Sequence, residues 1–381
     1  MRFPEFSGEW EKNNLSKFSS KITKKNKGNF INNVLCNSAN LGIIPQNDYF
    51  DRDIANADNT DSYYIIEQGD FVYNPRKSTA APYGPVNIYN GEKPGIISPL
   101  YLCFSVFNIS PSFLFYRFKS SVWHPYVYSH GDTGVRYDRV SIKDDVFFDM
   151  PIYTPTQNEQ EKIATLLFLI DERIATQNKI IEDLKKLKSA IVDKLCSSTN
   201  GKTYSFCQLF EVVNEKNKKL AYKNVLSASQ ELGMIERSNI NIDIKFEQES
   251  ISGYKIVRKG DYVVHLRSFQ GGFAFSDTTG ICSPAYTILR PNDLVVYSYL
   301  SHFFTSKPFI KSLKLVTYGI RDGRSINVDE WLDMPILLPS AQEQMRILTI
   351  VNAIDAKLHN EAKVQFCLSS QKSYLLNTMF I

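Results

Sequence analysis

The chain has 381 residues, of which 43% are hydrophobic, and its formal net charge is +4. This length and apolar fraction predict two or three folded domains with substantial cores, which excludes a largely disordered protein. The mild positive charge permits contact with nucleic acid but does not require it.

The sequence gives no sign of a membrane protein or of a metal-stabilised one. The segment Met1–Glu5 lacks the apolar stretch of a secretion signal, and polar residues interrupt the most apolar run, Leu100–Phe118. We therefore expect a cytoplasmic protein without a membrane span. The six cysteines include no pair at metal-ligand spacing and have no histidine within a few residues, so structural zinc has little support.

Each half of the chain begins with a compositionally mixed part. Runs rich in β-branched and aromatic residues, two of them entered from a Gly-Asp turn, predict short strands. In chain order these strands are expected near Val34 and at 70–73, 86–89, 101–106, 146–153, 261–264 and 286–289. Helical segments are expected at 112–121 and 296–306. The mixture predicts an α+β fold.

Each half then continues into a long helix. Apolar residues recur at alternating spacings of three and four, the seam pattern of a coiled coil. The first seam comprises Ile163, Leu167, Ile170, Ile174, Ile181, Leu184, Ile191 and Leu195, and the second comprises Ile347, Val351, Ile354, Leu358, Leu368, Leu375 and Met379. Lys372 stands at the position of Lys188, and Glu361 and Gln365 make the second seam more polar. Because one such helix cannot bury its own stripe, we expect the two to form an antiparallel coiled coil.

The two halves are copies of one plan. Asp149-Met150-Pro151, Glu159-Gln160 and Ile170-Asp171 recur 184 positions later as Asp333-Met334-Pro335, Glu343-Gln344 and Ile354-Asp355. This period far exceeds the roughly 20 to 50 residues of a solenoid or propeller unit, so it indicates a duplicated domain. The sequence predicts two similar domains separated by two long helices, with a pseudo-two-fold internal repeat. The predicted segments are 1–157, 158–198, 199–341 and 342–381.

Basic and amide-bearing residues lie next to glycines at matching places in both halves. One cluster follows the Gly-Asp strands and comprises Asn74, Arg76 and Lys77 in the first half and His265, Arg267 and Gln270 in the second. The other comprises His130, Arg136 and Arg139, matched by Tyr318, Arg321 and Arg324. Arg reads guanine, Asn and Gln read adenine, and Lys or Arg contact phosphates. These residues are our candidates for a DNA-reading surface.

Matched and unmatched candidates have different interpretations. Arg136 and Arg321 could instead pair with internal carboxylates such as Asp138 or Asp322 and maintain the fold. Residues that read bases should differ between the halves, because the two halves would read different sequences. Asn74, Lys77, His265 and Gln270 differ in this way and are the better candidates for specificity.

We find no complete catalytic motif in the sequence. Gly271-Gly272 is not followed by the Lys-Ser or Lys-Thr of a phosphate loop, and no His-Glu-x-x-His is present. We therefore assign no catalytic residue and no metal site to this chain. If the protein takes part in catalysis, the reacting groups are expected on another chain.

The chain resembles the specificity subunits of type I restriction-modification systems, the HsdS family. The resemblance rests on 2–6 (RFPEF), on 260–272 (GDYVVHLRSFQGG), on 283–286 (SPAY) and on the run Pro151–Leu195. It implies two target-recognition domains that each read half of a split double-stranded DNA target, held apart by the helices. The partners it implies are two modification subunits, which bind S-adenosylmethionine and methylate adenine, and restriction subunits that use ATP and Mg.

In this resemblance the chain itself is not an enzyme and holds no cofactor. The helices would carry spacing or partner docking through Glu159, Gln160, Ile163, Ile170, Asp171, Glu343, Gln344, Ile347, Ile354 and Asp355. The leading hypothesis is therefore a non-catalytic DNA-recognition subunit. One alternative is a protein-only scaffold with two binding modules on a helical rod. Another is a self-contained enzyme with an unrecognised site.

Overall fold

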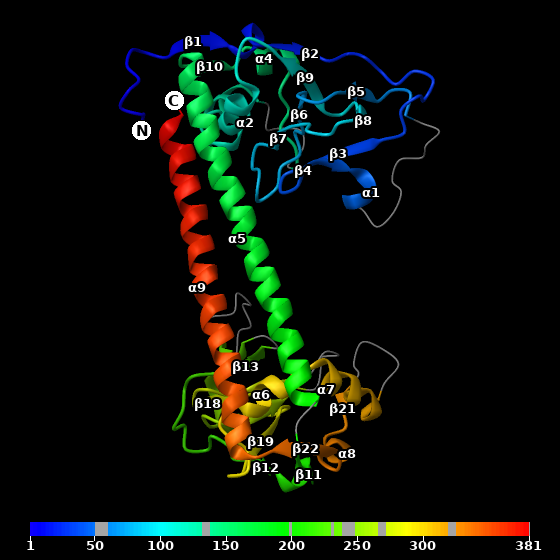
Figure 1. Cartoon of the computed structure of the whole chain (residues 1–381), viewed down its shortest axis with the longest axis vertical. Helices are drawn as coiled ribbons and strands as arrows, with labels where there is room; N and C mark the ends of the chain where they lie inside the picture. Colours follow the sequence, from blue (N-terminus) through cyan, green and yellow to red (C-terminus); the bar gives the residue numbers. More distant parts are fainter. Residues whose placement is uncertain are drawn as a thin grey trace. The chain divides into compact units, whose positions relative to one another are not determined.

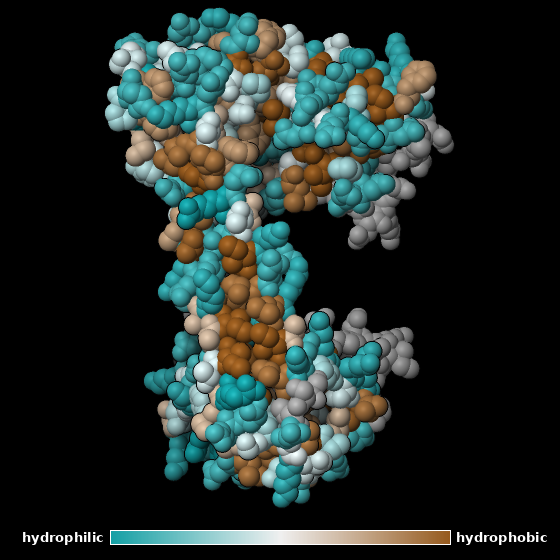
Figure 2. Space-filling view, viewed as in Figure 1, coloured by the Kyte–Doolittle hydropathy of each residue, from teal (hydrophilic) through white to brown (hydrophobic). Residues whose placement is uncertain are grey.

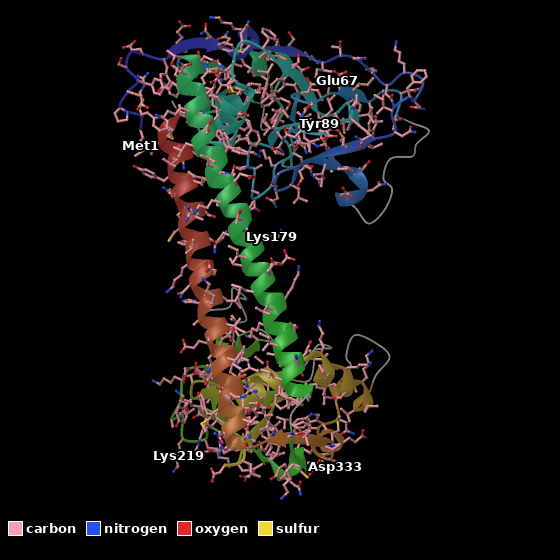
Figure 3. The ribbon with its side chains drawn as sticks, in the orientation of Figure 1. Met1, Glu67, Tyr89, Lys179, Lys219 and Asp333 are labelled. Carbon is pink, nitrogen blue, oxygen red and sulfur yellow. The ribbon has the colours of Figure 1, made fainter. Side chains whose placement is uncertain are left out.

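The computed structural model describes residues 1–49, 60–131, 138–197, 200–229, 232–237, 248–265, 272–318 and 325–380. The chain forms two compact units: unit 1 contains Met1–Asn178 and Lys363–Ile381, and unit 2 contains Lys179–Ala362. Lys179, labelled in Figure 3, is the first residue of unit 2. In the described ranges, no helix is long and apolar enough to cross a membrane.

The elements of unit 1 are short strands and helices followed by the start of a long helix (Figure 1). The strands are β1 (Glu11–Asn14), β2 (Ser19–Lys21), β3 (Val34–Ser38), β4 (Gly42–Pro45), β5 (Tyr64–Ile66), β6 (Phe71–Tyr73), β7 (Val86–Ile88), β8 (Gly95–Ile97), β9 (Leu102–Val106) and β10 (Pro151–Thr154). The helices are α1 (Gln46–Tyr49), α2 (Pro111–Lys119), α3 (His124–His130), α4 (Asp144–Phe148) and the first part of α5 (Gln157–Ser197). The last part of α9 (Ala341–Met379) also belongs to unit 1.

Unit 2 contains the rest of α5, the beginning of α9 and the elements between them. The strands are β11 (Gly201–Ser205), β12 (Phe210–Val213), β13 (Leu226–Ser229), β14 (Gly233–Glu236), β15 (Lys255–Val257), β16 (Tyr262–Val264), β17 (Phe273–Phe275), β18 (Gly280–Cys282), β19 (Thr287–Pro291), β20 (Thr317–Tyr318), β21 (Ser325–Ile326) and β22 (Pro335–Pro339). The helices are α6 (Tyr299–Phe303), α7 (Lys307–Ser312) and α8 (Val328–Leu332).

The sheets repeat between the units, which confirms the predicted duplication. The strand order β2-β9-β6-β7 in unit 1 recurs as β12-β19-β16-β17 in unit 2, and the pair β1-β10 recurs as β11-β22. The second sheet differs between the halves. In unit 1 it has the order β4-β3-β8-β5, with β3 parallel to β8, whereas the equivalent parallel contact in unit 2 is the single bridge of Val225 with Ile281.

Aromatic side chains fill the core of each unit. In unit 1, Tyr73 of β6 stacks on Phe147 with ring centroids 4.8 Å apart. In unit 2, Phe206 stacks on Trp331 at 4.2 Å. The long helices join these cores through buried seam residues, among them Ile163 and Leu375 in unit 1 and Ile347 and Val351 in unit 2. Each mixed part is therefore packed onto both long helices of its own unit.

The two long helices follow the predicted seam. In α5 the buried or half-buried positions recur at spacings of three and four from Ile163 to Leu195, including the polar Gln177 and Lys188. In α9 the same pattern runs from Ile347 to Met379. Within unit 1 the beginning of α5 packs with the end of α9, and within unit 2 the end of α5 packs with the beginning of α9. The predicted antiparallel pairing is thus confirmed inside each unit.

One predicted strand is partly wrong. The segment 146–153 was expected to be extended, but α4 occupies Asp144–Phe148 and only Pro151–Thr154 forms a strand. Two acidic residues, Asp144 and Asp145, stand in the first turn of α4, where the helix dipole favours negative charge. The buried Phe147 then packs from a helix rather than from a strand.

Candidate nucleic-acid interface

The structure brings together the two predicted clusters of the first half. Arg76 and Arg139 lie opposite each other in an antiparallel bridge. Hydrogen bonds flank the bridge, because Lys77 N donates to Asp138 O at 2.8 Å and Val140 N donates to Pro75 O at 2.9 Å. Residues more than sixty positions apart in sequence therefore form one basic surface, which we call the Arg76 surface (Arg76, Lys77 and Arg139).

Asn74 shapes the turn that carries this surface. Its side-chain Oδ1 accepts a hydrogen bond from Arg76 N at 3.0 Å, and its Nδ2 donates to Asn37 O at 3.2 Å. Gly84 packs against the same turn with φ of +84°, and a Cβ there would lie 2.1 Å from Asn74 O. The amide of Asn74 is therefore engaged within the protein, which is a structural role that the sequence did not reveal.

The positive charge of the Arg76 surface is largely uncompensated. Arg76 is exposed and Lys77 half-buried, and within the described ranges neither forms an ion pair. Arg139 has Asp138 as a loose partner at 3.9 Å, and its Nε is buried without a hydrogen-bond partner. Burial raises the pKa of the nearby Tyr101 hydroxyl, and the charges of Arg76 and Arg139 oppose that rise. Such a surface can attract the phosphates of DNA.

His130 lies close to this surface at the end of α3. Its ring is exposed and stacks on Tyr126 with centroids 4.1 Å apart. A Cβ on the adjacent Gly131 would lie 3.4 Å from Val140 Cγ1, which places the end of α3 beside the residue that follows Arg139. Arg136 lies outside the described residues.

In the second half, His265 takes the place of Asn74. His265 N donates to Gly272 O at 2.8 Å, as Asn74 N does to Pro85 O at 3.0 Å. Burial lowers the pKa of His265, and its Nε2 is buried without a hydrogen-bond partner. Tyr318 pairs through its backbone with Ser325, and its side chain lies outside the described residues, as do Arg267, Gln270, Arg321 and Arg324.

The repeated glutamines attach each long helix to its own mixed part. Gln160 is 5% exposed, and its Oε1 accepts from Ser110 N at 2.9 Å while its Nε2 donates to Pro155 O at 2.9 Å. Gln344 is 1% exposed and does the same, with Val296 N at 2.8 Å and Pro339 O at 2.9 Å. We call these two residues the glutamine clamps. Their repetition therefore has an internal explanation, and a role toward a partner stays a prediction.

The adjacent glutamates differ between the halves. Glu159 is fully buried, and both of its oxygens accept hydrogen bonds from Arg2 at 2.7 Å. Glu343 is instead partly exposed and pairs with Arg346 on its own helix at 2.6 Å. Arg2 was not among the predicted site residues, because no local pattern links it to a helix that begins more than 150 positions later.

The repeated Ile-Asp pairs lie in the seam. Asp171 pairs with Lys372 at 2.5 Å in unit 1, and Asp355 pairs with Lys188 at 2.6 Å in unit 2, so the repeat forms reciprocal ion pairs. Tyr116 donates a hydrogen bond to Asp171 at 3.0 Å. In unit 2, burial and then the charge of Lys188 lower the pKa of His302. Ile163, Ile170 and Ile347 are buried and Ile354 is half-buried.

Solved structures resemble this chain over nearly its whole length. A solved chain from work on complex assembly and conformational transition of the type I R-M system has a TM-score of 0.61 at 13% sequence identity. The match covers 98% of this chain and 97% of the solved chain. The HsdS subunit from Thermoanaerobacter tengcongensis has a TM-score of 0.51 at 13% identity and covers 99% and 98%. The type I restriction-modification system S subunit from M. genitalium has a TM-score of 0.54 at 14% identity and covers 100% and 99%.

These likenesses show that the chain has the fold of type I S subunits. No protein-family model matches the sequence. No curated protein matches it significantly.

Proposed function

We propose that this chain is the DNA sequence-specificity subunit of a type I restriction-modification system. The observation that carries the proposal is the duplicated plan of a mixed part followed by a seam helix, which the S-subunit structures share from end to end. Each half would read one part of a bipartite double-stranded target. In the first half, the uncompensated charge of the Arg76 surface supports a DNA-facing role.

The chain would act with other subunits and would not itself catalyse a reaction. Modification subunits would supply S-adenosylmethionine and methylate adenine, and restriction subunits would use ATP and Mg, in a cytoplasmic complex. Exposed apolar side chains on the long helices suit such docking, because contiguous apolar surface marks sites of protein contact. Examples are Phe168 and Phe366, which are 54% and 70% exposed. Figure 2 shows hydrophobic surface on these helices.

A protein-only scaffold would not retain DNA according to its sequence, whereas a specificity subunit would. The full chain, assembled with its modification subunit, should be used to select fragments of genomic DNA that it retains at moderate salt, and those fragments should be footprinted. We expect two short protected tracts separated by an unprotected gap, because each unit would contact one tract. Retention without sequence preference, or one continuous tract, would contradict the proposal.

A further inference from the structure

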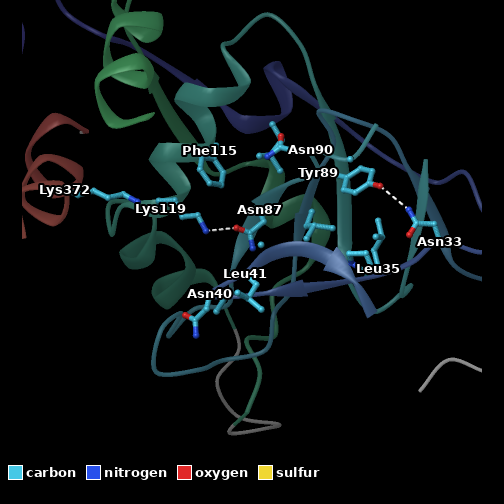
Figure 4. A pocket seen from close by; sticks show the side chains of 16 residues that line it. Asn33, Leu35, Asn40, Leu41, Asn87, Tyr89, Asn90, Phe115, Lys119 and Lys372 are labelled. Carbon is cyan, nitrogen blue, oxygen red and sulfur yellow. Dashed lines mark hydrogen bonds between the residues drawn. The ribbon is translucent and has the colours of Figure 1, made fainter. Parts of the chain in front are cut away.

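Unit 1 contains an open pocket of about 760 Å³ next to α2. The N-cap residue of α2 is Ser110, whose N–H donates to the clamp residue Gln160. The walls of the pocket come from β3, β4, β7, α2 and α9, as Figure 4 shows. The lining includes Lys119, Lys372 and four asparagines, and its described residues include no Asp or Glu. A pocket of this size can hold a small organic ligand, and its charge favours an anionic one.

Lys119 is the group that most needs a ligand. Its Nζ donates to Asn87 Oδ1 at 2.6 Å and lies 5.0 Å from the centroid of the Phe115 ring. Burial and the charge of Lys372 lower the pKa of Lys119 to about 8, and Asp171 only partly opposes this. Within the described ranges Lys119 has no ion-pair partner, whereas Lys372 pairs with Asp171 at 2.5 Å. Two of the three ammonium donors of Lys119 remain available to a bound group.

A chain of buried amides holds Lys119 in place. Asn87 Nδ2 donates to Asn37 Oδ1 at 2.6 Å and to Ser38 O at 2.9 Å, and Asn37 Nδ2 donates to Val72 O at 2.8 Å. Both asparagines are buried, at 2% and 4% exposure. The network fixes the amide of Asn87 with its oxygen toward the lysine. The ammonium is therefore positioned at the pocket wall before any ligand binds.

The second half shows that the fold does not need this network. In unit 1, Asn87 of β7 pairs with Val72 of β6. In unit 2, Val263 of β16 stands at the position of Val72 and pairs with Ala274, so Ala274 replaces Asn87. Asn37 pairs with Ile43 across β3 and β4, and the equivalent pair across β13 and β14 is Ala228 with Met234. Counting from the residues bound by the glutamine clamps, Ser110 and Val296, the equivalent of Lys119 is Thr305.

The contrast between the halves argues for a ligand. Burying a lysine without a counter-ion costs stability. In unit 2 the positions of Asn87, Asn37 and Lys119 are occupied by Ala274, Ala228 and Thr305. We propose that the pocket binds the phosphate group of a nucleotide, with Lys119 donating hydrogen bonds to phosphate oxygens. Phe115, which is half-buried in the lining, offers flat apolar surface for a base or sugar. The phosphate could belong to a free nucleotide, which goes beyond the proposed function, or to the backbone of bound DNA, which rests on it.

Two substitutions test the site independently, so that a folding defect in one of them does not decide the result. Lys119→Met removes the ammonium, and Leu41→Glu adds a negative charge to the pocket lining at a side chain that is 60% exposed. The matched control is Leu232→Glu, because Leu232 occupies the same place in the second half and is 70% exposed. Lys311→Met controls for the loss of one exposed positive charge. Thermal melting by circular dichroism should show that Leu41→Glu and both controls remain folded.

The measurement is isothermal titration of the full chain with AMP, with adenosine as the ligand that lacks phosphate. For a free-nucleotide site, we expect AMP but not adenosine to bind, and both pocket variants to weaken AMP binding about tenfold or more, since a charge-assisted hydrogen bond is lost or opposed. The controls should bind AMP as the unmodified chain does. If AMP binds equally well to all variants, the pocket does not bind AMP, and the free-nucleotide form of the proposal is overturned.

A second arm distinguishes DNA as the source of the phosphate. If AMP does not bind, the salt dependence of duplex binding should become shallower by about one ion in the Lys119→Met chain and not in the Lys311→Met chain. If neither AMP binding nor this slope depends on Lys119, the pocket is not a phosphate site. Duplex binding by the unmodified chain tests the proposed function separately, so the two failures are distinguishable.

Discussion

Replacing Gln160 with Leu is expected to destabilise unit 1 by about 3 kcal/mol, because two buried backbone groups would lose their partner and each unpaired group costs roughly 1 to 3 kcal/mol. These groups are the N–H of Ser110 and the carbonyl of Pro155. Leu is similar in volume to Gln, so cavity formation adds little. The unfolding temperature should fall by roughly 10 °C.

The measurement is hydrogen exchange with peptide-level readout, which assigns the effect to a unit. Gln160→Leu should speed exchange in α2 and at the start of α5, and Gln344→Leu should speed exchange in α6 and at the start of α9. The matched control is Gln157→Leu, an exposed glutamine in the first turn of α5, which should change little. If Gln160→Leu behaved like this control, the clamp would not hold the helix to the mixed part.

Replacing Arg76, Lys77 and Arg139 together with Ala is expected to weaken DNA binding roughly a hundredfold at low salt, because three positive charges near phosphates would be lost. The slope of log affinity against log salt should become shallower by about two to three. Fluorescence anisotropy of a labelled duplex, repeated over a salt series, measures both quantities.

A control with equal charge loss separates the surface from net charge. Lys179, Lys185 and Lys363 are exposed on the long helices, so replacing these three with Ala removes the same charge. That variant should keep most of the affinity. Because the Nε of Arg139 is buried, the single variant Arg76→Ala, at an exposed side chain, provides a second check that is independent of folding. Equal losses in the two triple variants would show that the Arg76 surface has no special role.

The repeated features were predictable because their physical basis is local. A stripe of apolar residues at spacings of three and four specifies a helix and its buried face whatever its partner. The shared register of Lys188 and Lys372 in the two seams was also visible. Asp171 and Asp355 could be identified in the sequence as repeated residues. Their ion pairs with Lys372 and Lys188 could not be predicted, because they form only when α5 packs antiparallel to α9.

The unpredicted features depend on contacts between distant residues. Arg2 with Glu159, and Lys119 with Asn87 and Asn37, meet only in the folded unit. The repetition of Gln160 and Gln344 suggested partner docking or a spacer role, and the folded chain adds that their amides bind backbone groups of their own units. Asn74 was selected for base reading by residue type, and its amide holds a turn. Residue type suggests a chemistry, but only geometry shows whether the group is free.

Adenine methylation mapping tests the central claim most directly. The chain should be expressed with the proposed modification subunit, once unmodified and once with residues 1–157 replaced by the corresponding half of a type I S subunit. We predict a methylated target of two short sequences with a fixed gap, of which the exchange alters one and leaves the other unchanged. An unchanged target after the exchange, or a single continuous sequence, would contradict the account.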